Sequence, residues 1–253
     1  MSVKNIIFKL SAFYAFGACF MAVVPSASAF TFSSNSDSVT INAADINQSF
    51  EINFDGNVAT KNVGGLSSKG IFTFLGFTTV GSNTEAKFDI SLSNTSSNGI
   101  TSRTSALGFN VSKALVGVGN TNGSGNTRVS GLFNNDRAGS FPNQFGNVDV
   151  CFTNGNTCQG GGNGGVSTGS GVATFSPILA FTGNVTSFTL SNLGVRYQSI
   201  TGTNLGNSGT GKGFYVAPPV PPKKVSEPTT AAAIALFAVS ALVVKKKKHL
   251  LPA

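Results

Sequence analysis

The sequence predicts an all-β exported domain, an antiparallel sandwich of jelly-roll-like form, between an N-terminal signal helix and a C-terminal single transmembrane helix. Apolar and polar residues alternate with a period of two, the pattern of strands with one face in the core and one in water. The alternating stretches are residues 50–55, 86–93, 148–152 and 193–197. Breaks rich in Gly, Asn and Ser separate them, and several segments lack helical spacing. Because the chain has no tryptophan, we expect a core largely of phenylalanine with Val, Leu and Ile.

The first 29 residues have the three parts of a secretory signal peptide. Two lysines precede an apolar stretch from Leu10 to Val24, and the small residues Ala27 and Ala29 follow. We therefore expect export by the Sec machinery and cleavage by signal peptidase after Ala29. An uncleaved membrane anchor is the alternative interpretation of the same residues.

Two cysteines, Cys151 and Cys158, remain after the signal segment. An exported chain lies in an oxidising compartment, so one short disulfide is expected, contributing about 2.5 kcal/mol in the chain-entropy model. A pair of reduced thiols is the alternative. A zinc site is not expected, because it needs about four ligands and the one histidine lies in the tail.

The net charge of +8 lies almost entirely at the two ends of the chain. Residues 30–217 have nine basic and eight acidic side chains, with no basic cluster. The electrostatic pattern of a nucleic-acid-binding protein is therefore missing, and nucleic acid is not predicted as a partner.

Two stretches resemble ligand-binding loops incompletely. Residues 206–213 nearly match a phosphate-binding loop, but Gly213 stands where Ser or Thr must reach Mg²⁺, so we predict a flexible loop. Residues 45–49 resemble the start of a calcium loop, but Phe50 replaces the turn glycine and Gly56 replaces the bidentate glutamate. Their alternation predicts a strand instead. No cofactor and no metal are predicted.

Catalysis is not predicted for this chain. The only histidine, His249, lies in the tail, which excludes a Ser–His–Asp site in the domain. Glu51 and Asp55 could form the carboxylate pair of a glycoside hydrolase, but their alternation with apolar residues predicts a solvated face. Tyr197 and Tyr215 could stack on sugars, although packing in the core or at its rim is expected.

The last thirty residues have the composition of a transient membrane anchor. Residues 217–224 form a proline-rich linker that should be extended. Residues 231–244 carry no charge; as a helix they span about 21 Å, short of a bilayer core of about 30 Å. By the positive-inside rule, the lysines after this run lie in the cytoplasm. They are Lys245, Lys246, Lys247 and Lys248.

A short motif stands between the linker and the apolar run. It reads Val225, Ser226, Glu227, Pro228 and Thr229. Together with the apolar run and the lysines, it resembles the sorting signal of PEP-CTERM proteins. Members of that family usually have a proline at the position that Ser226 occupies in this chain. The resemblance implies an exosortase, a membrane transpeptidase that processes the tail, as a partner. It also implies an exopolysaccharide-producing bacterium, with exopolysaccharide as a further partner.

Parts of the domain look like the cistern family of PEP-CTERM proteins. The similar stretches begin at Gly65, Ser93, Asp149 and Val195. The resemblance covers nearly the whole exported domain and implies no defined biochemical activity.

These observations divide the chain into five segments. They are a signal peptide (1–29), an exported β-rich domain (30–216), a linker (217–224), a sorting signal with its transmembrane helix (225–248) and a cytoplasmic tail (249–253). The predicted function is that of a non-enzymatic structural protein of the cell surface or extracellular matrix, held at the membrane during sorting. The alternatives are a carbohydrate-binding or glycan-hydrolysing surface module and a plain single-pass anchored protein.

Overall fold

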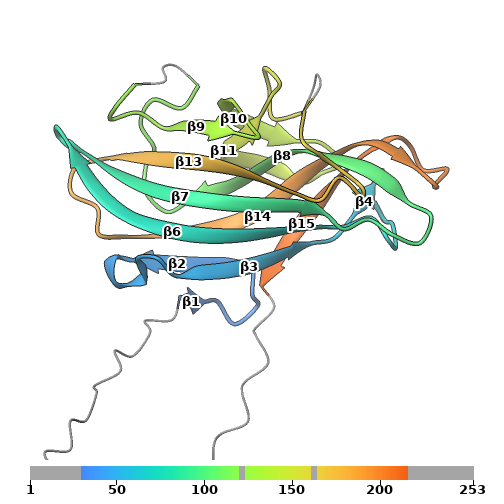
Figure 1. Ribbon diagram of the computed structural model, residues 1–253, viewed down its shortest axis with the longest axis horizontal. Coiled ribbons are helices and arrows are strands. Elements are labelled where there is room, and N and C mark those ends of the chain that lie inside the picture. The colour runs from blue at the N-terminus through green and yellow to red at the C-terminus, as the bar shows by residue number, and fades with distance from the viewer. Residues whose placement is uncertain (1–29, 120–122, 161–163, 216–253) are drawn as a thin grey trace, which may run out of the picture.

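The computed structural model describes residues 30–119, 123–160 and 164–215, which form one all-β unit (Figure 1). All strand pairs in this part of the chain are antiparallel. The prediction of an all-β, antiparallel fold is therefore confirmed. The one helix in the described ranges is a short 3-10 turn, η1 (Ala43–Asp45). The predicted signal peptide, linker, sorting signal, transmembrane helix and tail lie outside the described residues.

Fifteen strands of the described chain join one sheet. They are β1 (Thr31–Phe32), β2 (Ser38–Asn42), β3 (Ser49–Phe54), β4 (Asn57–Val58), β5 (Lys61–Asn62), β6 (Ser68–Val80), β7 (Asn83–Asn94), β8 (Thr101–Val111), β9 (Arg128–Gly131), β10 (Asn135–Phe141), β11 (Gly146–Thr153), β12 (Val166–Ser167), β13 (Val172–Thr182), β14 (Ser187–Thr201) and β15 (Ser208–Tyr215). Four of them, β3, β7, β11 and β14, coincide with the four alternating stretches, as predicted, except that Asp55 lies just beyond the end of β3.

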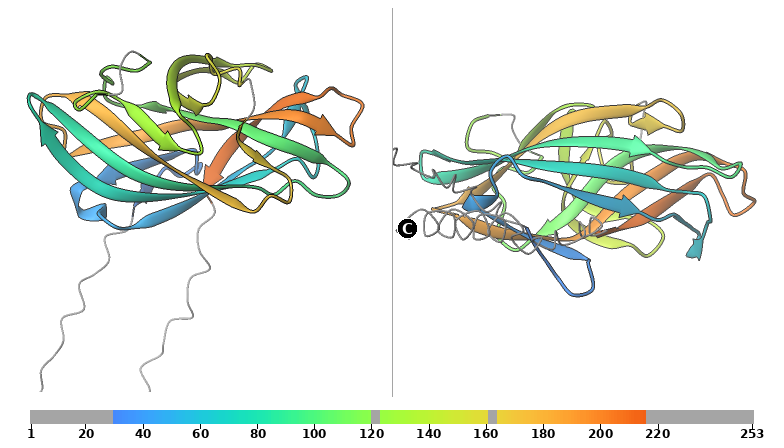
Figure 2. Two further views of the ribbon diagram at one scale, coloured as in Figure 1. Left: turned by 45° about the horizontal axis from the view of Figure 1, so that its top comes forward. Right: turned by 60° about the horizontal axis from the view of Figure 1, so that its bottom comes forward.

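The sheet runs in the order β10-β11-β8-β14-β15-β3-β6-β7-β13-β9, with β1, β2, β4, β5 and β12 on its margins. Its two terminal strands, β9 and β10, contact each other, so the sheet is nearly closed and barrel-like. Figure 2 shows it curling around the space that the core side chains fill. One half of the sheet therefore packs its inner face against the other half.

Strand β15 carries the sheet from one half to the other. It pairs with β14 through Ser208–Lys212 and with β3 through Gly213–Tyr215. A Cβ atom on Gly211 would lie 2.2 Å from the Asp55 carbonyl oxygen, and one on Gly213 would lie 2.8 Å from the Ile52 side chain. The alternating glycines thus permit close backbone approach. The prediction of a flexible loop over residues 206–213 is wrong, because most of these residues form this strand.

The core between the two halves is rich in phenylalanine, as the composition predicts. Its largest fully buried side chains are Tyr197, Phe54, Phe72, Phe74, Phe109, Phe133, Phe152, Phe175, Phe181, Ile41, Ile52 and Leu66. Rings from both halves meet: the Phe152 ring on β11 lies 5.8 Å from the Phe175 ring on β13. Such pairs stabilise a fold beyond the area that they bury.

A second, smaller cluster covers part of the outer face of β8, β11 and β14. It consists of Ala106, Phe141, Val148, Cys151 and Cys158, with Phe145 packed against it. A Cβ atom on Gly194 would lie 2.1 Å from the Phe145 ring, so this ring rests directly on the backbone of β14. The predicted disulfide joins Cys151 to Cys158 within this cluster.

Removing the disulfide is expected to lower the free energy of unfolding by about 2.5 kcal/mol, because the unfolded chain regains the freedom that the cross-link removes. The test is urea unfolding of the Cys151→Ala, Cys158→Ala double variant beside the unaltered chain, with and without reductant. Alanine avoids an unpaired hydroxyl at two buried positions. The unaltered chain in reductant should match the double variant. Equal stability of all samples would contradict this contribution.

The two ends of the described unit lie side by side, at β1 and the last residues of β15 (Figure 1). The rings of Phe32 and Tyr215 stack with their centroids 3.4 Å apart, and the Tyr215 amide donates to the Ser36 carbonyl at 3.0 Å. Phe30 packs edge-on against Phe50, with ring centroids 4.8 Å apart. Both ends are thus fixed to the same side of the domain.

Candidate functional site

Glu51 on β3 and Asp55 just beyond its end, the carboxylates considered for glycan hydrolysis, both bind neighbouring protein groups. The Glu51 carboxylate lies 3.3 Å from the Lys69 ammonium group and accepts a hydrogen bond from the side-chain amide of Asn53. Asp55 accepts a hydrogen bond of 2.6 Å from the backbone amide of Lys212. Neither carboxylate lines any of the hollows described below. Glu51 lies on the partly exposed side of β3, as the alternation predicts.

The two tyrosines of the domain do not form an exposed platform for sugars. Tyr197 is fully buried, and its hydroxyl donates to the Asp55 carbonyl at 3.0 Å. Burial raises the pKa of Tyr197 far above its usual value. Tyr215 is partly buried beside Phe32. The prediction that both tyrosines pack in the core or at its rim is confirmed.

The stretch that resembles a calcium loop shapes the backbone between β2 and β3. Asp45 is fully buried and accepts a hydrogen bond of 2.7 Å from the Asn42 amide, which closes the 3-10 turn. Asn47 has a positive φ of 62°, and Ser49 shares a hydrogen bond with Thr73. Within the described ranges, no three His, Cys, Asp or Glu residues gather where they could hold a metal ion.

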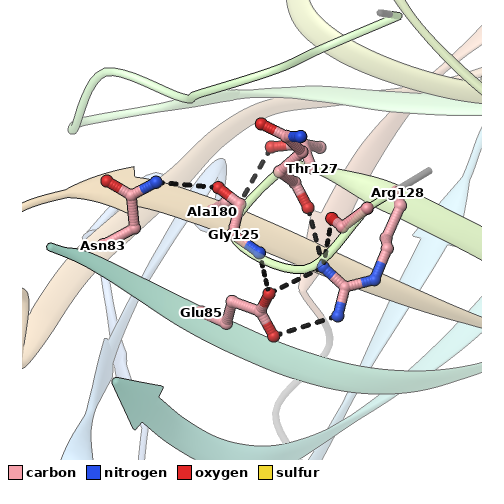
Figure 3. A network of polar contacts seen from close by, with 8 residues as sticks. Asn83, Glu85, Gly125, Thr127, Arg128 and Ala180 are labelled. Carbon is pink, nitrogen blue, oxygen red and sulfur yellow. Dashed lines mark hydrogen bonds and ion pairs between the residues drawn. The ribbon is translucent and has the colours of Figure 1, made fainter. Parts of the chain in front are cut away.

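A polar network, which the sequence did not reveal, fastens a long connection to the sheet (Figure 3). Glu85 on β7 is 1% exposed, and both its oxygens accept hydrogen bonds from Arg128, at 2.7 and 3.0 Å. The Gly125 amide donates to the same carboxylate at 2.6 Å. Asn83 donates to the Gly125 carbonyl, and the Ala180 amide donates to Thr127. The network joins the segment before β9 to strands β7 and β13.

The Glu85 network should make stability depend on pH. Its hydrogen bonds with Arg128 hold the pKa of Glu85 below its usual value, against the opposing effect of burial. A lowered pKa contributes stability that is present above the unfolded-state pKa, about 4.3, and is lost as pH falls through the folded-state value.

We therefore expect the difference in unfolding free energy between the unaltered chain and Glu85→Gln to shrink as pH falls below about 4.3. Urea unfolding of both proteins between about pH 3 and pH 7 measures this difference. A difference that stays constant over that range would contradict the role assigned to the ionised carboxylate.

An open groove of about 700 Å³ lies beside the β10–β11 hairpin. Its walls are formed by Val111, Ser112, Lys113, Ala114, Leu115, Val118, Ala138, Gly139, Asn147, Val148 and Asp149. Asp149 accepts a hydrogen bond of 2.8 Å from the Val111 amide. Its charged wall residues, Lys113 and Asp149, have opposite signs and leave the groove without net charge.

A second depression surrounds Arg103 and is lined by polar side chains. It consists of two adjoining hollows of about 280 and 260 Å³, which share Arg103 and Ser199. One is completed by Thr101, Ser102, Ser167 and Thr168, and the other by Gln198, Asn207 and Ser208. We call the two hollows together the Arg103 cleft. Strands β8, β12, β14 and β15 supply most of its wall.

Two neutral oxygens hold the Arg103 guanidinium group in place. Nη2 donates to the Gln198 side-chain oxygen at 2.8 Å, and Nη1 donates to the Gly164 carbonyl. The ion pairs within residues 30–119, 123–160 and 164–215 are Lys69–Glu51 and Arg128–Glu85, so Arg103 forms none there. Its charge is therefore not neutralised by a described carboxylate.

A second arginine lies on the same outer face, next to the Arg103 cleft. Arg196 is 6% exposed and donates to the carbonyls of Gln159, Tyr197 and Gly209. Burial lowers the pKa of Arg196 to about 10, so the group keeps its charge at neutral pH. It forms no ion pair with a described carboxylate either.

Fold and clefts together define this protein as an all-β domain with a disulfide and a polar cleft of net positive charge. No family model, curated protein or solved structure matches the chain. In the described part of the chain, no helix is long and apolar enough to span a membrane.

Proposed function

We propose that the chain is an exported, non-enzymatic structural protein of the cell surface or extracellular matrix, whose C-terminal tail is processed by an exosortase-type transpeptidase. The observation that supports export is the disulfide between Cys151 and Cys158, the two cysteines of the predicted exported part; processing of the tail is proposed from the sequence motif alone. Such a bond persists in an oxidising compartment and is rare in the cytosol.

The position of the domain ends supports the same proposal. Phe32 and Tyr215 stack on one side of the domain, so the chain enters and leaves there. A domain tethered through its C-terminal end would turn this side to the membrane and the rest of its surface outward. This arrangement suits a protein that is held during sorting and then displayed.

The surface of β3 supports a non-enzymatic role. Glu51 is paired with Lys69, and Asp55 is bound by the Lys212 amide. A glycoside hydrolase needs two carboxylates facing one bound substrate across about 5–10 Å. The two proposed carboxylates instead contact protein groups outside the hollows, which gives hydrolysis no geometric support.

The redox state of the cysteines tests export. The full chain should accumulate in the envelope or medium and, when unfolded in denaturant, take up no alkylating agent at Cys151 and Cys158 until it is reduced. A variant lacking residues 1–29 should stay in the cytoplasm, with both cysteines alkylated in the same denaturant without added reductant. Cys19 leaves with the signal segment in the first case and is deleted in the second, so it does not disturb the comparison. A full chain found in the cytoplasm with free thiols at Cys151 and Cys158 would overturn the proposal.

A further inference from the structure

We propose that the Arg103 cleft binds the acidic sugar units of an extracellular polysaccharide. The inference deepens the proposed function and rests on it in one respect, since only an exported domain meets such a polymer. The cleft itself is argued from its lining, its charge and its size.

The lining of the cleft is suited to the hydroxyl groups of a sugar. Apart from Arg103, the wall consists of hydroxyl and amide side chains, which are Thr101, Ser102, Ser167, Thr168, Gln198, Ser199, Asn207 and Ser208. Hydroxyl and amide groups both donate and accept hydrogen bonds, so they can pair with a ligand that presents many hydroxyls in varied directions.

The charge of the cleft selects an acidic sugar over a neutral one. The guanidinium group of Arg103 has five N–H donors, and the described contacts occupy two of them, through Gln198 and Gly164. The remaining donors can bind a carboxylate in the bidentate manner that arginine favours. Arg196 adds a second positive charge on the same face, and among the described residues no carboxylate lines either hollow.

Gly160 lies against both Arg196 and Gln198, and Gln198 links this pair to Arg103. A Cβ atom built on Gly160 would lie 3.0 Å from Arg196 Cγ and 3.4 Å from Gln198 Cδ. Gln198 in turn binds Arg103. The Arg196 stem and the Arg103 guanidinium group therefore both lie beside Gln198, which brings two positively charged side chains to the region of the cleft.

The size and the backbone of the cleft are consistent with a ligand site. Its two hollows, about 280 and 260 Å³, together fall within the range of roughly 300–1,000 Å³ that is usual for ligand pockets. Ser199, which the hollows share, has a positive φ of 52°. A non-glycine residue held in this conformation is often found at functional sites.

The test is calorimetric titration of the purified full chain with tetragalacturonate, with its neutral methyl ester, and with tetra-aspartate. We expect binding of tetragalacturonate, at least about tenfold weaker binding of the ester, and weakening by salt. Arg103→Gln should weaken binding by at least about tenfold, and Arg103→Lys by less, because lysine keeps the charge but loses the planar fork. Lys87→Gln removes one charge on β7, in the other half of the sheet, and should leave affinity within about twofold.

Three outcomes would overturn the inference. They are no binding of tetragalacturonate, equal binding by the unaltered chain and by Arg103→Gln, or equally tight binding of tetra-aspartate, which would indicate a site for acidic peptides. If Arg103→Gln does not fold, Asn207→Ala is tested in its place, and weaker binding of tetragalacturonate is again expected. Binding is measured on purified protein, so failure to bind by a correctly exported chain overturns the cleft alone. Binding by a chain that stays in the cytoplasm overturns the proposed export alone.

Discussion

Replacing Glu85 by alanine is expected to lower the free energy of unfolding by about 3–5 kcal/mol. The substitution leaves Arg128, whose side chain is 21% exposed, without its bidentate partner, and it also deprives the Gly125 amide of an acceptor. Breaking a buried pair from one side is costly because a partly desolvated charge remains. Equilibrium unfolding in guanidinium chloride measures the loss.

Glu51→Ala is the matched control for this substitution. It also removes a glutamate from an ion pair, but the side chains of Glu51 and Lys69 are 40% and 38% exposed. Water screens such a pair, so a loss of at most about 1 kcal/mol is expected. Replacing Glu85 and Arg128 together by leucine and methionine should cost less than Glu85→Ala alone, because no unpaired charge remains. Equal losses for Glu85→Ala and Glu51→Ala would refute the role given to the network.

Phe175→Ala is expected to lower the free energy of unfolding by about 3–5 kcal/mol as well. Phe175 on β13 is 1% exposed, and its ring contacts those of Phe133 and Phe152. Because Phe152 belongs to β11, the substitution opens a cavity where the two halves of the sheet meet. The same denaturant titration measures this loss.

Phe214→Ala serves as the control for the core substitution. The Phe214 side chain on β15 is 43% exposed, so its removal opens no enclosed cavity. A change within about 0.5 kcal/mol is expected, as for most surface positions. If Phe214→Ala were as destabilising as Phe175→Ala, the sheet would not be closing around the phenylalanine core described above.

Strands with one solvent-exposed face, such as β3, could be predicted from the sequence. Strand β15, whose glycines pack closely against neighbouring strands, could not. In β3, Phe50, Ile52 and Phe54 alternate with polar residues, and this signal requires no knowledge of the neighbouring strands. In β15, Gly209 and Gly211 occupy buried positions where larger side chains would collide with the next strand. Glycine there has the appearance of a loop in a sequence, because the reason for it lies in the partner strand.

The candidate sites depend on strand register, which the sequence does not contain. Arg103 and Gln198 are 95 positions apart and meet because β8 pairs with β14. Glu85 and Arg128 are 43 positions apart and belong to different strands. The disulfide could be predicted, because only one pairing exists once two cysteines remain in the exported part. The partners of Arg103 and Arg128 could not be predicted, because nine basic and eight acidic residues in the domain allow many pairings.

The most direct test of the central proposal is the mass of the mature chain. The full sequence is expressed in a host that has the sorting machinery, and the envelope and medium fractions are analysed by intact mass and by terminal peptides. The proposal predicts a product that begins at Phe30 and ends between Val225 and Thr230. A product that still carries residues 245–253 would contradict processing of the tail and would leave this protein a simple membrane-anchored domain.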